Sequence, residues 1–408
     1  MRYNTSMEQN NIIIVVGGGA SGMLCALALA EGGQRNITLL ERGDRLGKKL
    51  SATGNGQGNV TNVNFGIEHY FSDGKDTVET ILNAFDHRAL LKYLENLGGW
   101  FESDERGRVY PTGRQASAVT DLLRFALQRV GVNVQTGVTV TQISRRGKEY
   151  VLSDSEGRSF KARAVVLATG GKAAKNFGTD GTGYALAKSL GHTLTPLFPA
   201  LVQLKTDTSY IKGLKGIRID CLVRAYDGKK ELSSARGDVI FTDYGVSGNA
   251  IFQVSSYLTD ARSPQLRLEF LPGVSAQTLI ELLRKKQRVS PQGEILGCIV
   301  NNQLGRALLK RLQSEGDGFS PEAAVALMKD FRLTVTGTLG FDYAQVTRGG
   351  IPMREVDGEL MSKKSENVYL CGEILNVDGE CGGYNLQWAF SSGMRVAKSI
   401  LKRAKEWV

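Results

Sequence analysis

Proline, cysteine and histidine are scarce in this chain, and their scarcity excludes several classes of protein. Among 408 residues there are 8 prolines, 5 cysteines and 3 histidines. The cysteines are odd in number, widely spaced and without a Cys-x-x-Cys pair. We therefore expect neither a disulfide framework nor a zinc site, and a reducing compartment is favoured. The residues concerned are Cys25, Cys221, Cys298, Cys371 and Cys381, with His69, His87 and His192.

Long apolar runs are also lacking. No run approaches the roughly 18 residues that a membrane span needs. The first residues, Met1 to Asn11, are polar and lack the apolar core of a signal peptide. Hydrophobic residues make up 41% and charged residues 23% of the chain, which is ordinary globular usage. We expect a cytoplasmic protein of two or three domains.

Acidic residues are outnumbered by basic ones, 41 to 51, which gives a net charge of +10. This excess favours an anionic partner. No basic stripe interleaved with aromatic residues is present, so no nucleic acid is expected and cofactor phosphates explain part of the charge. Glycine is abundant, with 49 residues, or about 12% against a usual level of about 7%. An excess of glycine without proline is typical of tight turns and of backbone lying close to a ligand.

A glycine motif near the N-terminus has the context of a dinucleotide-binding fingerprint. The apolar, β-branched run Ile12–Val16 predicts a buried strand that ends at Gly17. The pattern Gly17-x-Gly19-x-x-Gly22 follows and leads into a small, apolar helix. Gly17 would make the tight turn, Gly19 would admit the pyrophosphate, and Gly22 would let helix and strand pack closely. Glu41 ends the next predicted strand, where it would accept ribose hydroxyls and disfavour NADP.

Later segments distinguish FAD from NAD in this site. A loop rich in glycine and small polar residues spans Ser51 to Asn62. Two further strands end in Ala168-Thr169-Gly170-Gly171 and in Gly372-Glu373, and Gly382-Gly383 opens the last helix. The return of the final strand and helix to the site suits an extended ligand such as FAD, whereas an NAD domain does not require it.

Short segments along nearly the whole chain carry a family resemblance. They are Gly17–Gly22, Arg45–Leu50, Asn59–Asn62, Gly107–Pro111, Gly178–Tyr184, Gly191–Thr193, Pro199–Val202, Phe241–Gly248, and Gly372-Glu373 with Gly382–Ala389. On these segments the chain resembles the BaiN-like, aminoacetone-oxidase-like family of bacterial flavoproteins, which have the glutathione-reductase-type FAD fold. The chain departs from the family where Gln57-Gly58 replaces the usual Arg-Cys, and where Asn249 replaces a frequent proline.

The resemblance implies FAD, with Gly372-Glu373 near the ribitol phosphate and the turn before the last helix against the isoalloxazine. The positive end of that helix would stabilise negative charge on the reduced ring. The predicted cofactor-binding residues are Gly17, Gly19, Ala20, Ser21, Gly22, Glu41, Arg42, Lys49, Leu50, Thr53, Gly54, Asn59, Thr61, Asn62, Val138, Ala168, Thr169, Gly170, Gly171, Gly372, Glu373, Gly383, Tyr384, Asn385, Leu386 and Gln387.

The expected fold is α/β, with a Rossmann-like FAD-binding domain of the glutathione-reductase type interrupted by a β-rich cap that carries a helical insertion. The FAD domain is expected to comprise residues 1–197 and 345–408. The cap is expected at 198–273 and 333–344, because strand-like pieces such as Leu201–Leu204 occur there. The helical insertion is expected at 274–332.

The leading functional expectation is an FAD-dependent oxidoreductase that transfers hydride between flavin N5 and a small organic substrate. The resemblance implies reduction of an enone-type C=C bond in a steroid or bile acid, with NAD(P)H visiting transiently because no second fingerprint is visible. Alternatives are an amine or aminoacetone oxidase that releases peroxide from oxygen, and a flavin-containing RNA-binding or regulatory protein. Candidate catalytic residues are Tyr244, Tyr384 and His192. A monomer or homodimer is expected.

Overall fold

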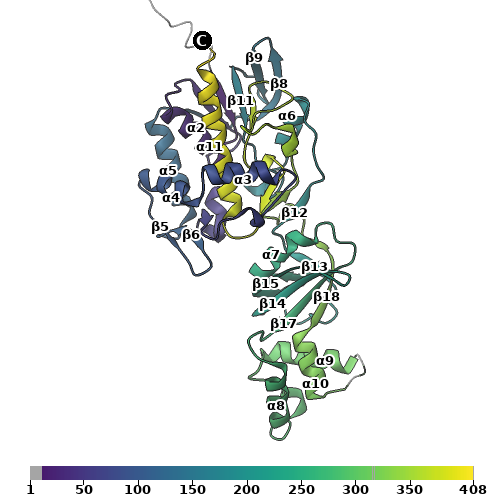
Figure 1. Ribbon diagram of the computed structural model, residues 1–408. Helices are drawn as coiled ribbons and strands as arrows, with labels where there is room; N and C mark the ends of the chain where they lie inside the picture. The colour runs from purple at the N-terminus through teal and green to yellow at the C-terminus, as the bar shows by residue number, and fades with distance from the viewer. Residues whose placement is uncertain (1–11, 315, 317, 408) are drawn as a thin grey trace, which may run out of the picture. The chain divides into compact units, whose positions relative to one another are not determined.

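The computed structural model describes residues 12–407 except 315 and 317, so the expectation for Met1 to Asn11 lies outside the described residues. The chain divides into two compact units. The first comprises the residues up to Phe198 together with those from Val346 onward, and the second comprises Pro199–Gln345. Figure 1 shows that the chain leaves the first unit once and returns to it. The two units are described separately below.

A parallel sheet of five strands forms the centre of the first unit. Its order is β20-β11-β1-β2-β7. Strand β1, which is buried along its length, lies between β11 and β2. The late strand β20 pairs with β11, which brings the end of the chain to the predicted dinucleotide site, as expected. The bounds are β1 Ile13–Val16, β2 Ile37–Glu41, β7 Asn133–Thr136, β11 Ala164–Leu167 and β20 Val368–Leu370.

Helices α2 (Ala20–Glu31) and α11 (Tyr384–Ala404) pack against each other in the first unit (Figure 1). Two glycines permit their close approach. A Cβ on Gly393 would overlap the backbone carbonyl of Ser21, and a Cβ on Gly32 would overlap the Leu401 side chain. Because α2 begins at the glycine turn, this packing fixes the start of α11 relative to the predicted dinucleotide site.

Smaller elements complete the first unit. An antiparallel sheet, β10-β9-β8, precedes the strand that ends in the Ala-Thr-Gly segment. Two further small sheets, β3-β6-β5 and β21-β4, contain segments next to the predicted flavin site. The bounds are β3 Thr61–Asn62, β4 Tyr70–Ser72, α3 Lys75–Ala84, α4 His87–Asn96, β5 Phe101–Ser103, β6 Arg108–Pro111, α5 Ala116–Arg129, β8 Val140–Arg146, β9 Glu149–Asp154, β10 Ser159–Ala162, α6 Thr182–Ser189, β19 Val346–Arg348 and β21 Val377–Gly379. Strand β12, Phe198–Ala200, begins at the last residue before the second unit.

The second unit contains a closed barrel with the strand order β13-β16-β15-β14-β17-β18. Alternate residues of β14 and β17 are buried, which gives the barrel its core. The predicted strand Leu201–Leu204 is wrong in its first three residues, since Leu201 has φ of 50° and β13 begins only at Leu204. The strands are β13 Leu204–Thr206, β14 Arg218–Asp227, β15 Lys230–Phe241, β16 Gly245–Ser247, β17 Pro264–Phe270 and β18 Phe331–Thr338.

Helices α7 (Asn249–Ser255), α8 (Ala276–Lys286), α9 (Asn302–Ser314) and α10 (Pro321–Lys329) accompany the barrel. The last three lie between β17 and β18 in the sequence, and their buried leucines belong to the same hydrophobic core as the barrel strands. The Ser320 hydroxyl accepts a hydrogen bond from Ala323 N–H at 3.0 Å and so caps α10. The α/β fold class with a β-rich region is confirmed. The proposed division into a cap and a separate helical insertion stays a prediction.

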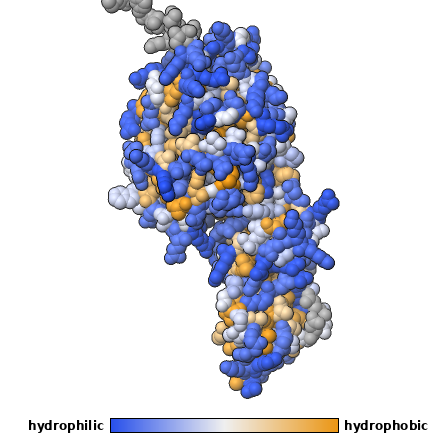
Figure 2. All heavy atoms as spheres, viewed as in Figure 1, coloured by the Kyte–Doolittle hydropathy of each residue, from blue (hydrophilic) through white to orange (hydrophobic). Residues whose placement is uncertain are grey.

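The face drawn in Figure 2 is covered mostly by hydrophilic residues, with small apolar patches between them. Within residues 12–407, apart from the two that are not described, no helix has the length and apolarity to cross a membrane.

Candidate active site

The three fingerprint glycines have different surroundings at the start of α2. A Cβ on Gly17, where φ is 109°, would overlap the carbonyl oxygen of Ala168, and a Cβ on Gly22 would overlap that of Gly17. A Cβ on Gly19 would meet nothing within 4 Å. The first and third glycines are therefore required by packing, whereas the second leaves open space at the positive end of α2. This is the arrangement that a pyrophosphate needs.

Glu41 lies at the end of β2 and holds the glycine turn. Its carboxylate accepts hydrogen bonds from Gly18 N–H at 2.7 Å and from Gly43 N–H at 2.6 Å. Its backbone carbonyl accepts from Val138 N–H at 2.9 Å. A carboxylate offers about four lone-pair positions, so these two bonds leave capacity for the hydroxyls of a ribose. The predicted ribose role of Glu41 therefore fits the geometry.

The segment after β11 contains a buried hydroxyl with no partner. Among the described residues, Thr169 Oγ1 is buried and makes no hydrogen bond. A buried polar atom is normally satisfied, so this hydroxyl beside a glycine turn is free to hydrogen-bond to a ligand. The neighbouring Gly171 is closely enclosed, because a Cβ there would be 2.5 Å from Thr347 Oγ1 and 2.9 Å from Glu373 Oε1. Together with the space at Gly19, this residue set fits FAD.

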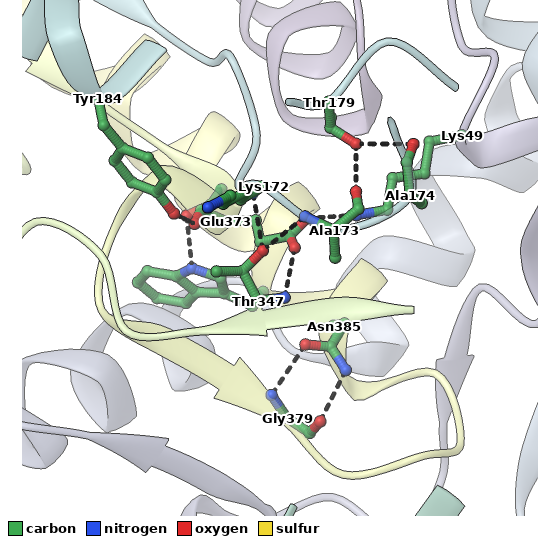
Figure 3. A network of polar contacts seen from close by, with 12 residues as sticks. Lys49, Lys172, Ala173, Ala174, Thr179, Tyr184, Thr347, Glu373, Gly379 and Asn385 are labelled. Atoms are coloured by element: carbon green, nitrogen blue, oxygen red, sulfur yellow. Dashed lines mark hydrogen bonds and ion pairs between the residues drawn. The ribbon is translucent and has the colours of Figure 1, made fainter. Parts of the chain in front are cut away.

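Glu373 connects segments that are far apart in the sequence (Figure 3). Its Oε2 atom accepts from Lys49 Nζ at 2.7 Å, and its Oε1 atom accepts from Thr347 N–H at 2.8 Å. The Thr347 hydroxyl in turn accepts from the backbone N–H groups of Lys172 and Ala173, at 2.8 and 2.9 Å. The network joins the loop after β2, the loop after β11, strand β19 and the segment after β20.

The start of α11 is built against strand β3. Gly382 and Gly383 have φ of 135° and 104°, and a Cβ on Gly383 would overlap the Thr61 carbonyl. Asn62 Nδ2 donates to the Gly382 carbonyl at 2.9 Å. Asn385 closes a ring with Gly379, accepting from its N–H at 2.8 Å and donating to its carbonyl at 2.7 Å (Figure 3). The two polar motifs predicted to contact the flavin therefore meet at one helix N-terminus.

Some predicted cofactor ligands have side chains that form hydrogen bonds within the protein. Gln387 is fully buried, and its amide contacts the Thr61 hydroxyl at 2.6 Å and the Phe85 carbonyl at 2.9 Å. Asn59 Nδ2 donates to the Thr61 and Val109 carbonyls at 2.9 and 3.1 Å. These two side chains fix the loop and the helix to each other. Their direct contact with the cofactor stays a prediction.

The remaining predicted ligands lie in the first unit. The Arg42 guanidinium pairs with Asp180 at 2.7 Å. The Thr53 hydroxyl donates to the Leu50 carbonyl at 2.7 Å, and Gly54 beside it is exposed. A Cβ on Gly372 would be 2.6 Å from the buried Ser21 hydroxyl oxygen. Ala20, Ala168 and Leu50 are buried, Gly170 has φ of 71°, and Leu386 is half-buried on the first turn of α11.

In the loop where Gln57-Gly58 replaces the family's Arg-Cys, the backbone adopts a conformation that favours glycine. Gly58 has φ of 81°, and a Cβ there would be 2.9 Å from the Cα of Ala116. A cysteine at this position would therefore be strained in the conformation that the loop adopts. Gln57 is exposed.

The tyrosine candidates for catalysis differ in position. Tyr384, the first residue of α11, is 5% exposed, and its hydroxyl donates to the Asn64 carbonyl at 2.9 Å. Burial raises the pKa of the Tyr384 hydroxyl well above its usual value, so its proton is firmly held. Tyr244 is half-buried next to β16 in the second unit, and its catalytic role stays a prediction.

His192 has both ring nitrogens engaged and no exposed side-chain surface. Nδ1 is 2.9 Å from Glu355 Oε2, and Nε2 is 2.8 Å from the Ser362 hydroxyl oxygen. Thr193 donates to the same carboxylate, from its N–H at 2.9 Å and from its hydroxyl at 2.5 Å. The ring therefore stabilises the packing after α6 and presents no nitrogen to a substrate.

This network predicts a loss of stability in acid. Burial lowers the pKa of His192 below its ordinary 6.5. Burial alone would raise the pKa of Glu355, but hydrogen bonds from Thr193 and His192 outweigh it and lower that pKa below 4.5. In both cases the unfolded chain binds more protons, so stability falls as the pH drops below about 6.5 and again below about 4.5.

The variant His192→Gln is expected to be less stable than wild type near neutral pH. It should lose less stability than wild type between about pH 7 and pH 5, because its titrating ring is gone. Melting temperatures measured across this range test the expectation. His87, whose pKa burial also lowers, is present in both proteins and cancels in the comparison. Melting temperatures that fall equally with pH in the two proteins would contradict this expectation.

A parallel sheet with a dinucleotide turn, an orphaned hydroxyl beside it and a late helix that begins at the same site define an FAD-binding Rossmann-type oxidoreductase. The chain belongs to the HI0933-like family, because the model described as "HI0933-like protein Rossmann domain" matches residues 11–399. This match confirms the predicted family, the flavoprotein class and FAD as the cofactor.

Relatives of similar length support the assignment. The chain is 36% identical over 409 residues to the 3-dehydro-bile acid delta(4,6)-reductase of Clostridium scindens, covering 96% of this chain and all of that protein. It is 27% identical to the ribosomal RNA dihydrouridine synthase of Haemophilus influenzae, covering 97% of this chain and all of that protein. The structure of 3-ketosteroid delta1-dehydrogenase from Sterolibacterium denitrificans shares the fold, with a TM-score of 0.51 and 13% identity, covering 96% of this chain and 99% of that one.

Sequence reasoning missed some residues of this site. Thr347 lies in a segment without a recognisable motif, and Asp180 lies in the family-like segment Gly178–Tyr184 but was not predicted as a site residue. Only the fold brings them to Glu373 and Arg42. His69 and Glu380 were also missed. The sole signal for this pair was the position of Glu380 just before the Gly382-Gly383 turn.

Proposed function

We propose that this protein reduces a carbon–carbon double bond conjugated to a carbonyl group, with a steroid-like or bile-acid-like ketone as substrate and NAD(P)H as the source of hydride. The observation that carries the proposal is the meeting of the Thr61-Asn62 and Gly382-Gly383 segments at the N-terminus of α11. The relative at 36% identity supports it, since its name describes reduction of such a bond. FAD, when bound, supplies the hydride-transfer chemistry.

The residues of the first unit would bind and orient this cofactor. The space at Gly19 and the positive end of α2 would receive the pyrophosphate, and Glu41 would accept hydrogen bonds from the ribose. Glu373, which accepts hydrogen bonds from Lys49 and Thr347, would hold the surrounding segments in place. The positive end of α11 would stabilise negative charge that develops beside it during the reaction.

The test is product analysis under anaerobic conditions. The purified holoprotein is incubated with NADH or NADPH and a 3-oxo-4-ene bile acid, and the product is examined by mass spectrometry. We expect a saturated ketone that has gained two hydrogen atoms, formed only when the reduced nicotinamide is present. Unchanged ketone, together with peroxide release when amines and air are supplied, would instead support the oxidase alternative.

A second candidate function is dihydrouridine formation in ribosomal RNA. Two relatives, at 27% and 26% identity, carry this name, and the net charge of +10 suits a polyanionic substrate. The double bond of uridine is likewise conjugated to a carbonyl, so the same hydride chemistry would serve. Incubation with unmodified ribosomal RNA distinguishes the two functions. Salt-sensitive RNA binding with dihydrouridine in the product, and no reduction of the bile acid, would favour the RNA substrate.

A further inference from the structure

The proposed reduction needs a proton as well as a hydride, and the candidates in the first unit that are named so far do not supply one. The Tyr384 hydroxyl is engaged with the Asn64 carbonyl, and both ring nitrogens of His192 are engaged within a buried network. Burial raises the pKa of the Cys381 thiol, in the turn before α11, to about 11. None of these groups is suited to give up a proton near neutral pH.

His69 lies beside the turn that precedes α11. It ends a short helical turn, Ile67–His69, and leads directly into β4. Strand β4 pairs with β21, where Tyr70 lies opposite Gly379. The His69 carbonyl then accepts from Glu380 N–H at 2.9 Å, which extends this pairing by one residue. The backbone therefore fixes His69 next to the segment expected against the flavin.

The imidazole of His69 is held from two sides. Its Nδ1 atom is 2.8 Å from Glu380 Oε2. Its ring stacks on the Tyr384 ring, with centroids 4.4 Å apart and planes inclined by 20°. Tyr70 contacts the same Tyr384 ring edge-on at 5.8 Å, so the stack is braced by β4 as well. These contacts fix both the position and the rotation of the imidazole.

The His69 ring is held less tightly at Nε2 than at Nδ1. Glu68 Oε1 lies 3.9 Å from Nε2, on an exposed side chain. The charged and titratable groups around the ring are thus Glu68, Glu380, Tyr384 and Tyr70. The His69 side chain is 25% exposed, so water can reach it to restore a proton. A carboxylate beside Nδ1 keeps a proton on that nitrogen, so Nε2 is the atom that carries and releases the second proton of the imidazolium.

We propose that His69 is the proton donor of the reduction and that Glu380 is its positioning residue. In this step the β-carbon of the conjugated ketone receives the hydride that NAD(P)H supplied to the flavin. The electron pair of the C=C bond moves toward the α-carbon, which takes the proton from Nε2. The imidazolium becomes neutral imidazole and regains a proton from water. The net reaction joins the ketone, NAD(P)H and one proton to give saturated ketone and NAD(P)+.

The proposal rests on the proposed function, and the experiment separates the two. The variant His69→Asn keeps a donor near the position of Nδ1 for Glu380 but lacks Nε2. In anaerobic stopped-flow mixing, bleaching of the flavin by NAD(P)H should match wild type. Reoxidation by the 3-oxo-4-ene bile acid should slow by about 100- to 10,000-fold, the usual contribution of a general acid, and should lose its pH dependence. Glu380→Gln should show an intermediate loss.

Three further measurements guard against a merely structural effect. Titration of the oxidised holoprotein with the saturated ketone should shift the flavin spectrum with the same affinity in wild type and His69→Asn. Added imidazole should rescue reoxidation in His69→Ala. The control His87→Asn, a half-buried histidine at the start of α4, should behave as wild type.

Three outcomes have different meanings. If wild type reduces the ketone and His69→Asn is reoxidised at the wild-type rate with the wild-type pH profile, the assignment of His69 is overturned while the proposed function stands. If wild type itself leaves the ketone unchanged, the proposed function fails and the assignment falls with it. A weaker affinity for saturated ketone without slower reoxidation at saturation would also overturn the assignment, because it would show a binding role only.

Discussion

Replacement of Gly19 by valine is expected to abolish tight FAD binding while leaving the apoprotein as stable as wild type. Gly19 has extended backbone angles, φ of −80° and ψ of −171°, which valine adopts readily. A Cβ there meets nothing within 4 Å in the folded chain. The added methyl groups would fill only the space that the pyrophosphate needs. We expect at least about a 100-fold loss of affinity, or about 2.8 kcal/mol.

This expectation is checked by titrating FAD into apoprotein and by measuring the melting temperature without cofactor. The matched control is Gly358→Val, since Gly358 is an exposed residue of the first unit and a Cβ there likewise meets nothing within 4 Å. The control should bind FAD as wild type does. Normal FAD affinity in Gly19→Val would show that the pyrophosphate lies elsewhere.

Replacement of Gly22 by alanine is expected to have the opposite effect, a large loss of stability in the apoprotein itself. A Cβ at this position would overlap the Gly17 carbonyl oxygen and lie 3.2 Å from the Ala168 side chain. Gly17 and buried Ala168 directly follow β1 and β11 and are tied to the sheet by backbone hydrogen bonds, so neither can move away freely. Helix α2 would have to separate from β1, and we expect a cost of about 3 kcal/mol or more.

Urea unfolding of the apoproteins measures this cost through the midpoint and slope of the transition. Gly19→Ala is the internal reference, because it makes the same chemical change three residues away and should leave the midpoint unchanged. Equal midpoints for Gly22→Ala and wild type would contradict the close packing of α2 on the sheet.

The sequence predicts those parts of the structure that depend on residues close together in the chain. The run Ile13–Val16, the glycine turn and the small residues of α2 specify one another within a few residues, so their pattern predicts both the fold and the dinucleotide site. The final strand and helix were likewise predictable, because Gly372-Glu373 and Gly382-Gly383 keep recognisable spacing. Their return to the same sheet follows from the parallel pairing of β20 with β11.

Polar contacts between residues far apart in the chain could not be predicted from the sequence. Thr347 N–H reaches Glu373 only because β19 passes beside the segment after β20, and no motif marks Thr347. The amides of Asn59 and Gln387 were predicted as cofactor ligands from their place in motifs, but the structure shows their side chains holding the backbone. The strand predicted at Leu201 fails because a left-handed backbone conformation there is not encoded by hydrophobicity.

The central claim is that this chain holds FAD so as to reduce a double bond conjugated to a carbonyl. The most direct test uses holoprotein reduced in advance with dithionite under anaerobic conditions, freed of excess reductant and mixed with the 3-oxo-4-ene bile acid. The account predicts that the visible flavin absorption returns and that one molecule of saturated ketone forms for each flavin reoxidised. A flavin that stays bleached until air is admitted, with the ketone recovered unchanged, would contradict it.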